Sequence, residues 1–432
     1  MAPMYDLAII GAGWAGFNAA LKAKKAGLKV CLIDAGQIGG TCLNRGCIPT
    51  KALITCAKAF SQIKKSSALG ILADNPRFNF NLIQERKDKL IRILSQGMQS
   101  RLTGIDFIQS RAQIISPHEI KVNNRNLSAK FILISTGSRP AELPQLKFDG
   151  KKIISSDEII ALTSVPGSLL IVGGGVIGCE FASLFSALGS KVSILERLPA
   201  LLPGQDKDIV RKIEVIFKKQ GIEVYVNADL AAVDLNNFEL VLVCVGREPN
   251  LTGLGLEELG IKLEKKAIAV DEYLKTNLDN IYAAGDCTAK IMLAHYAAYQ
   301  GERAVENMVS GNQHKADNAV VPACVFSEPE IASVGLSEEK AVLSGLPVKA
   351  YKFDFRASGM ARIMDEAEGF IKILVNHANQ EVIGACIIGP KATELIAILT
   401  MVISTHLKIS QIREIIFAHP TLAESLNEAV KN

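Results

Sequence analysis

The chain has 432 residues, of which 49% are hydrophobic and 21% are charged, so we expect about two to four ordinary globular domains. Its net charge of +4, from 48 basic and 44 acidic residues, gives no reason to expect nucleic acid as a partner. No apolar run approaches the roughly 18 residues of a membrane span, and nine unevenly spaced cysteines without a signal peptide favour a cytoplasmic protein.

A nucleotide-binding pattern opens the chain. The apolar run Leu7–Ile10 is typical of a buried strand and leads into Gly11-Ala-Gly13-Trp-Ala-Gly16, a helical stretch, and a second strand that ends at Asp34. Such glycines allow a tight turn and let a pyrophosphate approach N–H groups at a helix N-terminus. The acid is placed for ribose hydroxyls. Strand, glycines, helix, strand and acid in this order are far more specific than GxGxxG by itself.

Two cysteines five residues apart, Cys42 and Cys47, follow within Gly39–Lys51. A helix that starts near Thr41 would place them little more than one turn apart, within reach of a disulfide. Glycine at position 40 would let a flat ligand lie against the backbone. A helix N-terminus also lowers a thiol pKa. The stretch favours a redox-active dithiol beside a cofactor; the alternatives are two buried thiols or half a zinc site. No second pair follows nearby, so we predict no metal site.

The nucleotide-binding pattern recurs later in the chain. Leu169–Val172 leads to Gly173-Gly-Gly175-Val-Ile-Gly178, a helix, and a strand that ends at Glu196. The first glycine and the acid are 23 residues apart in both copies, from 11 to 34 and from 173 to 196. We therefore expect the chain to bind two nucleotides. Glu196 favours NAD, because it would repel a 2′-phosphate, although Arg197 follows directly.

Other stretches predict supporting elements. Apolar residues between positions 82 and 102 recur at helical spacing and predict one long structural helix. Phe131–Ile134, followed by Thr136-Gly137-Ser138, predicts a strand and a tight turn. Residues 281–286 predict another strand end, where Asp286 could either cap a helix that begins near Ala289 or hold a ligand.

Alternating apolar segments from about residue 319 predict an antiparallel sheet with strands at 320–326, 348–355, 370–375 and 382–388, then helices at 392–407 and 410–416. Pro420 predicts a helix start that places His419 just before the helix and Glu424 one turn in. These two side chains could hydrogen-bond as an oriented general base. The alternative is a surface or capping histidine.

As an ordered set, these motifs resemble the flavin-dependent pyridine nucleotide–disulfide oxidoreductases, and most of all their dihydrolipoamide dehydrogenase branch. The set comprises Gly39–Lys51, the paired fingerprints, Ser135-Thr-Gly137, Ala284-Gly-Asp286, Met292-Leu-Ala-His295 and His419-Pro-Thr-x-x-Glu424. The resemblance implies an α/β chain with two Rossmann-like nucleotide-binding domains and a C-terminal α+β dimerisation domain. The implied domains are 1–144 for FAD, a shortened 145–267 for NAD, 268–315 completing the FAD domain, and 316–432 for the dimer interface.

The resemblance also implies FAD in the first copy and NAD in the second. At FAD it places Gly11, Gly13, Gly16, Asp34, Gly40, Thr41, Lys51, Thr136, Gly137, Ser138, Asp286, Met292, Leu293, Ala294 and His295. At NAD it places Gly173, Gly175, Val176, Ile177, Gly178, Glu180, Glu196 and Gly246.

The implied reaction is the oxidation of dihydrolipoyl groups, free or on a partner protein, with hydride passed to NAD⁺. By similarity, Cys42 exchanges with the substrate and Cys47 faces the flavin. Lys51 would pair with Glu180 near the flavin. His419 would take a proton from the dithiol, oriented by Glu424. In this family the His–Glu pair reaches the other subunit's disulfide, so a twofold homodimer is implied.

Two departures from the family stand out. Arg45 occupies a position where valine is usual, and residues 222–240 leave space for little more than one hairpin where relatives carry a longer β-meander. We therefore expect an altered NAD affinity.

Two other functions are considered. One is a sister NAD(P)H-dependent reductase of the glutathione, trypanothione or mercuric type, against which Glu196 and the His419–Glu424 pair argue. The other is a flavoprotein without turnover, kept as a redox sensor or scaffold, which the intact dithiol and its expected partners disfavour.

Overall fold

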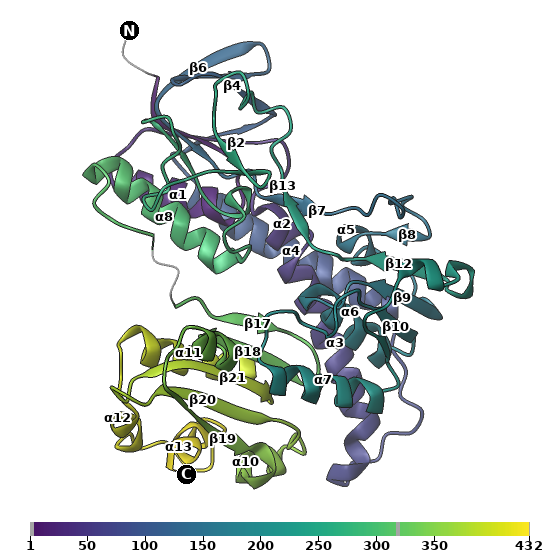
Figure 1. The fold of residues 1–432 in the computed structure, drawn as a ribbon. Helices are drawn as coiled ribbons and strands as arrows, with labels where there is room; N and C mark the ends of the chain where they lie inside the picture. The colour runs from purple at the N-terminus through teal and green to yellow at the C-terminus, as the bar shows by residue number, and fades with distance from the viewer. Residues whose placement is uncertain (1–3, 317–319, 432) are drawn as a thin grey trace. The chain divides into compact units, whose positions relative to one another are not determined.

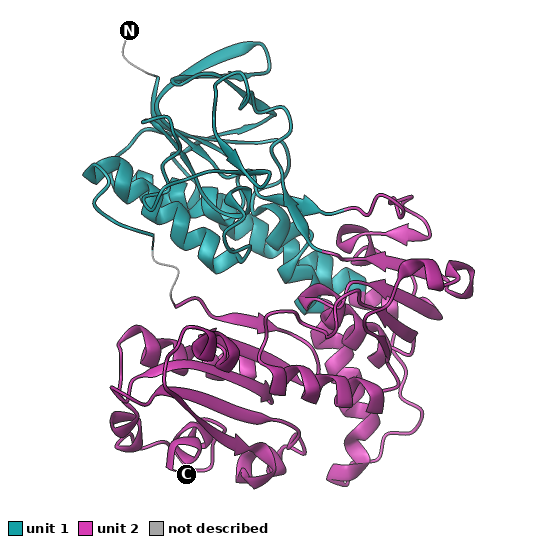
Figure 2. Ribbon diagram, viewed as in Figure 1, with its two compact units in different colours: residues 1–52, 84–141, 246–317 teal, residues 53–83, 142–245, 318–432 magenta. Residues whose placement is uncertain are grey.

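The computed structural model describes residues 4–316 and 320–431, which form two compact units (Figures 1 and 2). Unit 1 comprises residues 1–52, 84–141 and 246–317, and unit 2 comprises residues 53–83, 142–245 and 318–432. Each unit is thus assembled from three separate stretches of chain. Residues 1 and 432, the expected outer bounds of the first and last domains, and residue 319, the expected start of the sheet region, lie outside the described residues. The domain boundaries stay a prediction.

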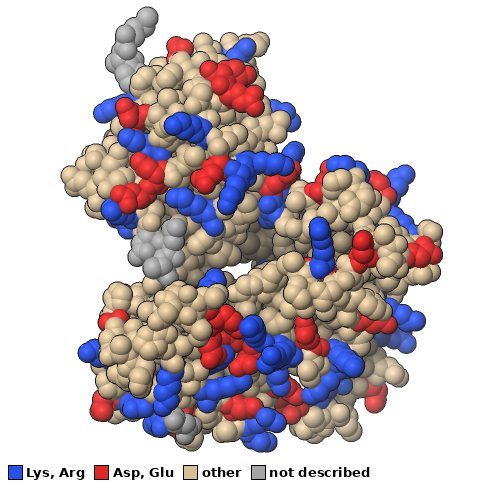
Figure 3. All heavy atoms as spheres, viewed as in Figure 1, with Lys and Arg blue, Asp and Glu red and all other residues tan. Residues whose placement is uncertain are grey.

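Across the described part of the chain, no helix combines the length and apolar character needed to cross a membrane. On the face drawn in Figure 3, basic and acidic side chains are interspersed over both units.

Unit 1 is built on a sheet whose first strand is buried on both faces. In β1 (Tyr5–Ile10), Leu7 and Ile9 join one apolar cluster and Ala8 and Ile10 join another, as the two-residue period of a strand requires. The sheet order is β3-β2-β1-β6-β5-β4, with β16 beside β6. The other bounds are β2 Val30–Asp34, β3 Asp106–Gln109, β4 Ala112–Ser116, β5 Glu119–Val122, β6 Arg125–Ile134 and β16 Ile281–Ala283. The strands β1, β2, β3, β6 and β16 pair in parallel.

Helices α1 (Trp14–Lys25) and α8 (Ala294–Ser310) pack closely side by side in this unit (Figure 1). A Cβ on Gly301 would lie 2.1 Å from the Ala15 carbonyl oxygen, so only glycine permits this approach. Lys22 and Glu306 form an ion pair at 2.6 Å across the same contact. The predicted long helix is α4 (Phe80–Arg101), which, like α3 (Cys47–Lys65), has residues in both units.

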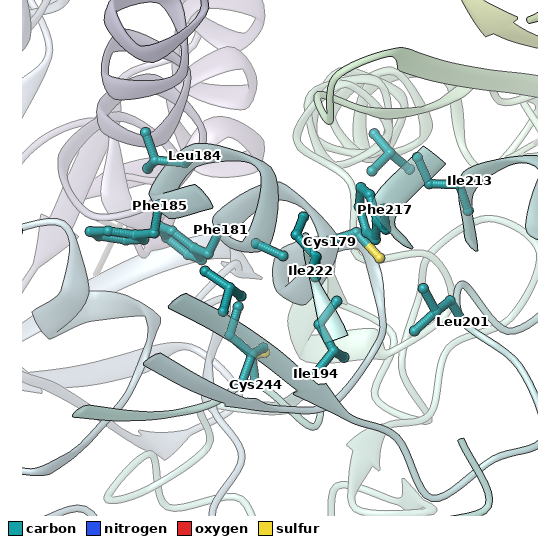
Figure 4. Close-up of a cluster of buried hydrophobic side chains, with 14 of the residues drawn as sticks. Cys179, Phe181, Leu184, Phe185, Ile194, Leu201, Ile213, Phe217, Ile222 and Cys244 are labelled. Carbon is teal, nitrogen blue, oxygen red and sulfur yellow. The ribbon is translucent and has the colours of Figure 1, made fainter. Parts of the chain in front are cut away.

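Unit 2 contains a second parallel sheet, of order β11-β10-β9-β12-β8. Its strands are β8 Ile153–Ile154, β9 Ser168–Val172, β10 Lys191–Leu195, β11 Glu223–Tyr225 and β12 Leu240–Val243. One face packs against α6 (Val176–Ala187) and α7 (Lys207–Lys219), where Phe181, Phe185 and Phe217 fill the core (Figure 4). The recurrence of the βαβ unit is therefore confirmed.

The segment before β12 is as short as the sequence analysis indicates, with space for little more than one hairpin. Instead of a hairpin, residues 223–237 form the single strand β11 and two 3₁₀ turns, η2 (Leu230–Ala232) and η3 (Leu235–Asn237). Asp229 and Asp234 cap these turns through bonds of 3.0 Å to Ala231 and Asn236 N–H groups. Their apolar side chains cover the second face of the sheet, packing with Val241 and Val243.

Unit 2 also contains the predicted antiparallel sheet, of order β17-β18-β21-β20-β19. Its strands are β17 Ala323–Val325, β18 Glu330–Gly335, β19 Val348–Asp354, β20 Phe370–Asn376 and β21 Val382–Gly389. The sequence did not predict β18, which is built largely of small residues. The two expected helices end earlier, at α11 Ala392–Ser404 and α12 Ile409–Arg413, and α13 spans Glu424–Lys431.

A buried ammonium group links α7 to the antiparallel sheet of unit 2. Lys372 of β20 lies 2.9 Å from the carboxylate of Asp206, the N-cap of α7, and both side chains are under 5% exposed. Glu338 and Asp208 complete the cluster at 2.6 and 3.2 Å. Burial by itself would lower the pKa of Lys372, but the hydrogen bonds to Glu338 and Asp206 outweigh it and raise that pKa.

This cluster generates a stability prediction. Lys372→Met should lower the free energy of unfolding by about 3–5 kcal/mol, because the Asp206 carboxylate stays buried without its counter-charge. Denaturant unfolding measures the effect. The control is Lys352→Met, which removes an ion pair of 3.2 Å to Asp208 from a half-exposed position and should cost less than about 1 kcal/mol. Equal losses in the two variants would contradict the assignment.

Candidate active site

Both glycine loops require glycine at their first position. Gly11 and Gly173 have φ of 109° and 111°, which side chains rarely adopt. A Cβ would also lie 2.2 Å from the Ser135 carbonyl oxygen in the first copy and 2.5 Å from that of Cys244 in the second. The two loops therefore share one backbone geometry, each pressed against the end of a neighbouring strand.

The third glycine of each loop lets the following helix pack against the turn. A Cβ on Gly16 would lie 1.8 Å from the Gly11 carbonyl oxygen, and one on Gly178 would lie 2.1 Å from that of Gly173. These contacts are too short for any other residue, so they fix where the N-terminus of each helix stands.

The middle glycines have open space instead. Gly13 and Gly175 are the N-caps of α1 and α6, and a Cβ on either would meet nothing within 4 Å among the described residues. The first turn of α6 begins with Val176 and Ile177. Each helix thus presents its N-terminal N–H groups at an opening, which is how helix termini receive phosphate groups.

The acid of each copy is held by two backbone N–H groups. One comes from the second residue of the glycine loop and the other from two residues beyond the acid. The bonds join Asp34 to Ala12 and Gly36 at 2.5 and 2.6 Å, and Glu196 to Gly174 and Leu198 at 2.6 and 2.7 Å. Such charge-assisted bonds fix each carboxylate at the end of its strand, beside the open turn.

The structure brings the other expected FAD residues to the same end of the first sheet. The Ser138 hydroxyl donates to Asp286 Oδ2 at 2.5 Å, and Arg247 Nε donates to the Ser138 hydroxyl at 2.8 Å. Thr136 Oγ1 is buried and has no hydrogen-bond partner among the described residues. This unsatisfied hydroxyl, together with the opening at Gly13, fits a bound flavin nucleotide. Sequence reasoning missed Arg247, although it follows Gly246 directly.

The residues 292–295 lie where α8 begins. Leu293 is the N-cap of the helix, and Ala294 and His295 are its first residues. Gly246, expected at NAD, adopts φ of 124° and accepts a hydrogen bond from Ala141 N–H at 3.0 Å.

The dithiol stretch is not one helix. The helix α2 spans Gly40–Asn44 and ends at Arg45, and α3 begins at Cys47. The expected single helix from Thr41 is therefore wrong, because the chain leaves helical geometry at Arg45, whose φ of −141° lies outside the helical range. The two cysteines instead flank the break.

This stretch rests directly on the first glycine loop. Gly39 N–H donates to the Ala12 carbonyl oxygen at 2.8 Å. Gly40 has φ of 56°, and a Cβ there would lie 2.8 Å from Cα of Gly13. The glycines at 39 and 40 thus allow the backbone that carries the cysteines to touch the backbone that would hold a nucleotide.

The two sulfurs are in contact across the break. A hydrogen bond between the Cys42 and Cys47 side chains, together with burial, raises the pKa of the Cys42 thiol, and the nearby Lys51 ammonium opposes this. Cys42 is half-buried and Cys47 is exposed.

His419 and Glu424 form the expected pair in unit 2. His419 Nδ1 lies 2.8 Å from Glu424 Oε2, and Thr421 N–H donates to Glu424 Oε1 at 3.2 Å. The hydrogen bond from His419 lowers the pKa of Glu424, and the imidazole is 77% exposed. Glu424 is the first residue of α13 and not one turn inside it, because the turn at 418–421 precedes the helix.

Glu180 has a partner that the sequence did not indicate. This buried carboxylate of α6 accepts from the Phe326 N–H at 3.0 Å, and one turn later the Ser183 hydroxyl accepts from the Glu328 N–H at 3.2 Å. Since Lys51 and Glu180 belong to different units, their pairing stays a prediction.

Comparisons with known proteins agree over nearly the whole chain. Residues 5–301 match the family model of the pyridine nucleotide-disulphide oxidoreductases, and residues 321–430 match the dimerisation domain of that family. A dihydrolipoyl dehydrogenase of Chlamydia pneumoniae is 38% identical over an alignment of 443 positions, which covers 98% of this chain and 96% of that protein. A dihydrolipoyl dehydrogenase of Bacillus subtilis is 38% identical over an alignment of 447 positions, which covers 98% of this chain and 97% of that protein.

Solved structures agree as well. The HOCl-induced flavoprotein disulfide reductase RclA of Escherichia coli is similar with a TM-score of 0.88 and 32% identity, covering 99% of both chains. LpdA of Mycobacterium tuberculosis has a TM-score of 0.92 and 27% identity, covering 98% of both. The matched domains imply FAD and NAD(H) as cofactors, and the dimerisation domain supports a homodimer. The chain belongs to the pyridine nucleotide–disulphide oxidoreductase family.

Proposed function

We propose that this enzyme is an NAD-dependent dihydrolipoyl dehydrogenase, which oxidises dihydrolipoyl groups to disulfides through Cys42 and Cys47. The proposal depends most on the contact between the dithiol stretch and the first glycine loop, where the Gly39 N–H donates a hydrogen bond to the Ala12 carbonyl oxygen at 2.8 Å. Two relatives that match nearly the full chain are named dihydrolipoyl dehydrogenase, which supports dihydrolipoyl groups as the substrate. When bound, FAD supplies the electron transfer from the dithiol to NAD⁺.

The two cysteines act in sequence. A substrate thiolate attacks the Cys42 sulfur of the disulfide, and the bond to Cys47 breaks as Cys47 leaves as a thiolate. The second substrate thiolate then attacks the substrate sulfur of this mixed disulfide and releases Cys42, so that the lipoyl disulfide forms and both cysteines are reduced.

His419 and Glu424 supply the base. With Nδ1 donating to Glu424, the neutral imidazole presents Nε2 to accept a substrate thiol proton. The ring is exposed, so a substrate from outside the unit can reach it. We propose that the pair completes the site of the other subunit of the homodimer, and that lipoyl groups reach it free or on a partner protein.

The second glycine loop binds NAD in this proposal. Its open N-cap at Gly175 receives the pyrophosphate, and the fixed carboxylate of Glu196 faces the adenosine ribose and disfavours a 2′-phosphate. We also propose a cytoplasmic location, because nine unevenly spaced cysteines suit a reducing compartment.

A sister disulfide reductase is the second candidate. The exposed Arg45 between the two cysteines favours it, since a cation there suits an anionic acceptor. The structural similarity to RclA, described as a disulfide reductase, points the same way. A higher kcat/KM with NADH and an anionic disulfide than with dihydrolipoamide and NAD⁺ would select this candidate.

His419→Ala should lower kcat for NADH formation from dihydrolipoamide and NAD⁺ by roughly 10²- to 10⁴-fold, because the substrate thiol loses its proton acceptor. Absorbance at 340 nm under anaerobic conditions follows the reaction. The matched control is His406→Ala, which removes another exposed histidine near a glutamate, 3.9 Å from Glu381, and should leave the rate unchanged. An active His419→Ala enzyme would refute the assigned base.

Cys42→Ser should abolish flavin reduction by dihydrolipoamide, because no mixed disulfide can form. Reduction of the flavin by NADH should persist in the same variant, since it does not pass through the dithiol. Rapid-mixing absorbance of the FAD-loaded protein separates the two reactions. A Cys56→Ser variant serves as the control for a substituted cysteine outside the pair. Dithiol-driven flavin reduction in Cys42→Ser would show that Cys42 does not exchange with substrate.

A further inference from the structure

Two thiols that the proposed chemistry does not use donate hydrogen bonds to the second glycine loop. Cys244, directly after β12, donates from Sγ to the Gly173 carbonyl oxygen at 3.4 Å. Cys179, in the first turns of α6, donates from Sγ to the Gly174 carbonyl oxygen at 3.5 Å. Both sulfurs are buried in the apolar core beneath the loop (Figure 4). The carbonyl groups of two consecutive loop residues therefore point inward at thiols.

These bonds fix the orientation of the two peptide planes in the loop. The plane between Gly173 and Gly174 is held at both ends, because its carbonyl accepts from Cys244 and its N–H donates to Glu196 at 2.6 Å. The next plane is held through the Gly174 carbonyl, which accepts from Cys179 and from Leu202 N–H at 2.9 Å. The far end of that plane is the Gly175 N–H group, at the opening before α6.

The first copy provides an internal comparison. Ser135 stands where Cys244 stands, and its N–H makes the same strand-end bond, to Ile10 at 2.8 Å. Its hydroxyl donates to the Gly11 carbonyl oxygen at 2.9 Å. The Ala12 carbonyl oxygen likewise accepts a hydrogen bond, from the Gly39 backbone N–H. The position of Cys179 is occupied by Phe17, which has no donor. A hydroxyl therefore holds the first loop where thiols hold the second.

The thiols are hydrogen-bond donors at neutral pH. Burial raises the pKa of Cys244 to about 12, and it also raises the pKa of Cys179 well above its ordinary value. Both groups stay protonated, so each S–H can donate. A thiol is a weaker donor than a hydroxyl, so the bond from Cys244 is weaker than the matching bond from Ser135 in the first loop.

We propose that Cys244 and Cys179 are positioning residues of the second glycine loop, and that their thiol hydrogen bonds hold its peptide groups in the orientation that binds the pyrophosphate of NAD. This inference rests on the proposed binding of NAD in the second copy. It assigns the two buried thiols to nucleotide affinity and not to the redox reaction of the dithiol.

The test compares Cys244→Ala, Cys244→Ser and Cys179→Ala in the FAD-loaded enzyme. Each alanine variant should raise the Kd for NADH and the KM for NAD⁺ by about three- to tenfold, as expected for one lost hydrogen bond. Flavin reduction by dihydrolipoamide should stay unchanged. Cys244→Ser reproduces the hydroxyl of the first copy and should bind NADH at least as tightly as the native enzyme.

Two further measurements keep the test decisive. Hydrogen–deuterium exchange of residues 172–180, measured without nucleotide, should quicken in the alanine variants and not in Cys244→Ser. The exchange rates test whether the thiols hold the loop, separately from nucleotide binding. A native enzyme that does not bind NADH would overturn the proposed function. Cys386→Ala is the control, because it removes a buried thiol of β21 away from the loop and should leave the Kd for NADH within twofold.

Either of two results would overturn the inference. One is an unchanged Kd for NADH together with unchanged exchange in both alanine variants. The other is an equal loss of NADH affinity in Cys386→Ala, which would show a general effect of emptying the core.

Discussion

The close approach of two backbone segments, one at Gly40 and the other at Gly13, is the constraint on which the account depends. A Cβ at position 40 would lie 2.8 Å from Cα of Gly13, so the dithiol stretch can touch the nucleotide loop only with glycine there. The bond from Gly39 N–H to Ala12 holds the same contact. Because the cysteines follow within a few residues, the proposed redox pair is held beside the first glycine loop by backbone geometry, not by a flexible side chain.

The two nucleotide sites show how one backbone design serves two partners. Both copies share the tight first and third glycines, the open middle glycine and the acid held by two N–H groups. They differ in what supports the loop from below, a hydroxyl of Ser135 in the first and thiols of Cys244 and Cys179 in the second.

The parts of the fold that follow from local periodicity could be predicted from the sequence, and those set by contacts between distant residues could not. Both βαβ units, the long helix and the C-terminal sheet are marked by apolar spacing and by glycines. The pairing of His419 with Glu424 follows from their separation of five residues. The helix break at Arg45 was missed, although Gly46 follows it directly and glycine is common just after a helix end. The partner of Lys372 is 166 residues away, so no local pattern could reveal the cluster. The covering of the parallel sheet of unit 2 by 3₁₀ turns likewise depends on contacts with β9 and β10, which lie far from these turns in the sequence.

The most direct test of the central claim is the rate of flavin reduction by dihydrolipoamide in Gly40→Ala, with the bound FAD measured in the same sample. The added Cβ should push the dithiol stretch away from Gly13, and the rate should fall at least about tenfold while reduction by NADH is retained. Gly70→Ala provides the control, because Gly70 also has a positive φ, of 77°, but a Cβ there would meet nothing within 4 Å among the described residues. A native rate in Gly40→Ala, or an equal loss in Gly70→Ala, would contradict the account.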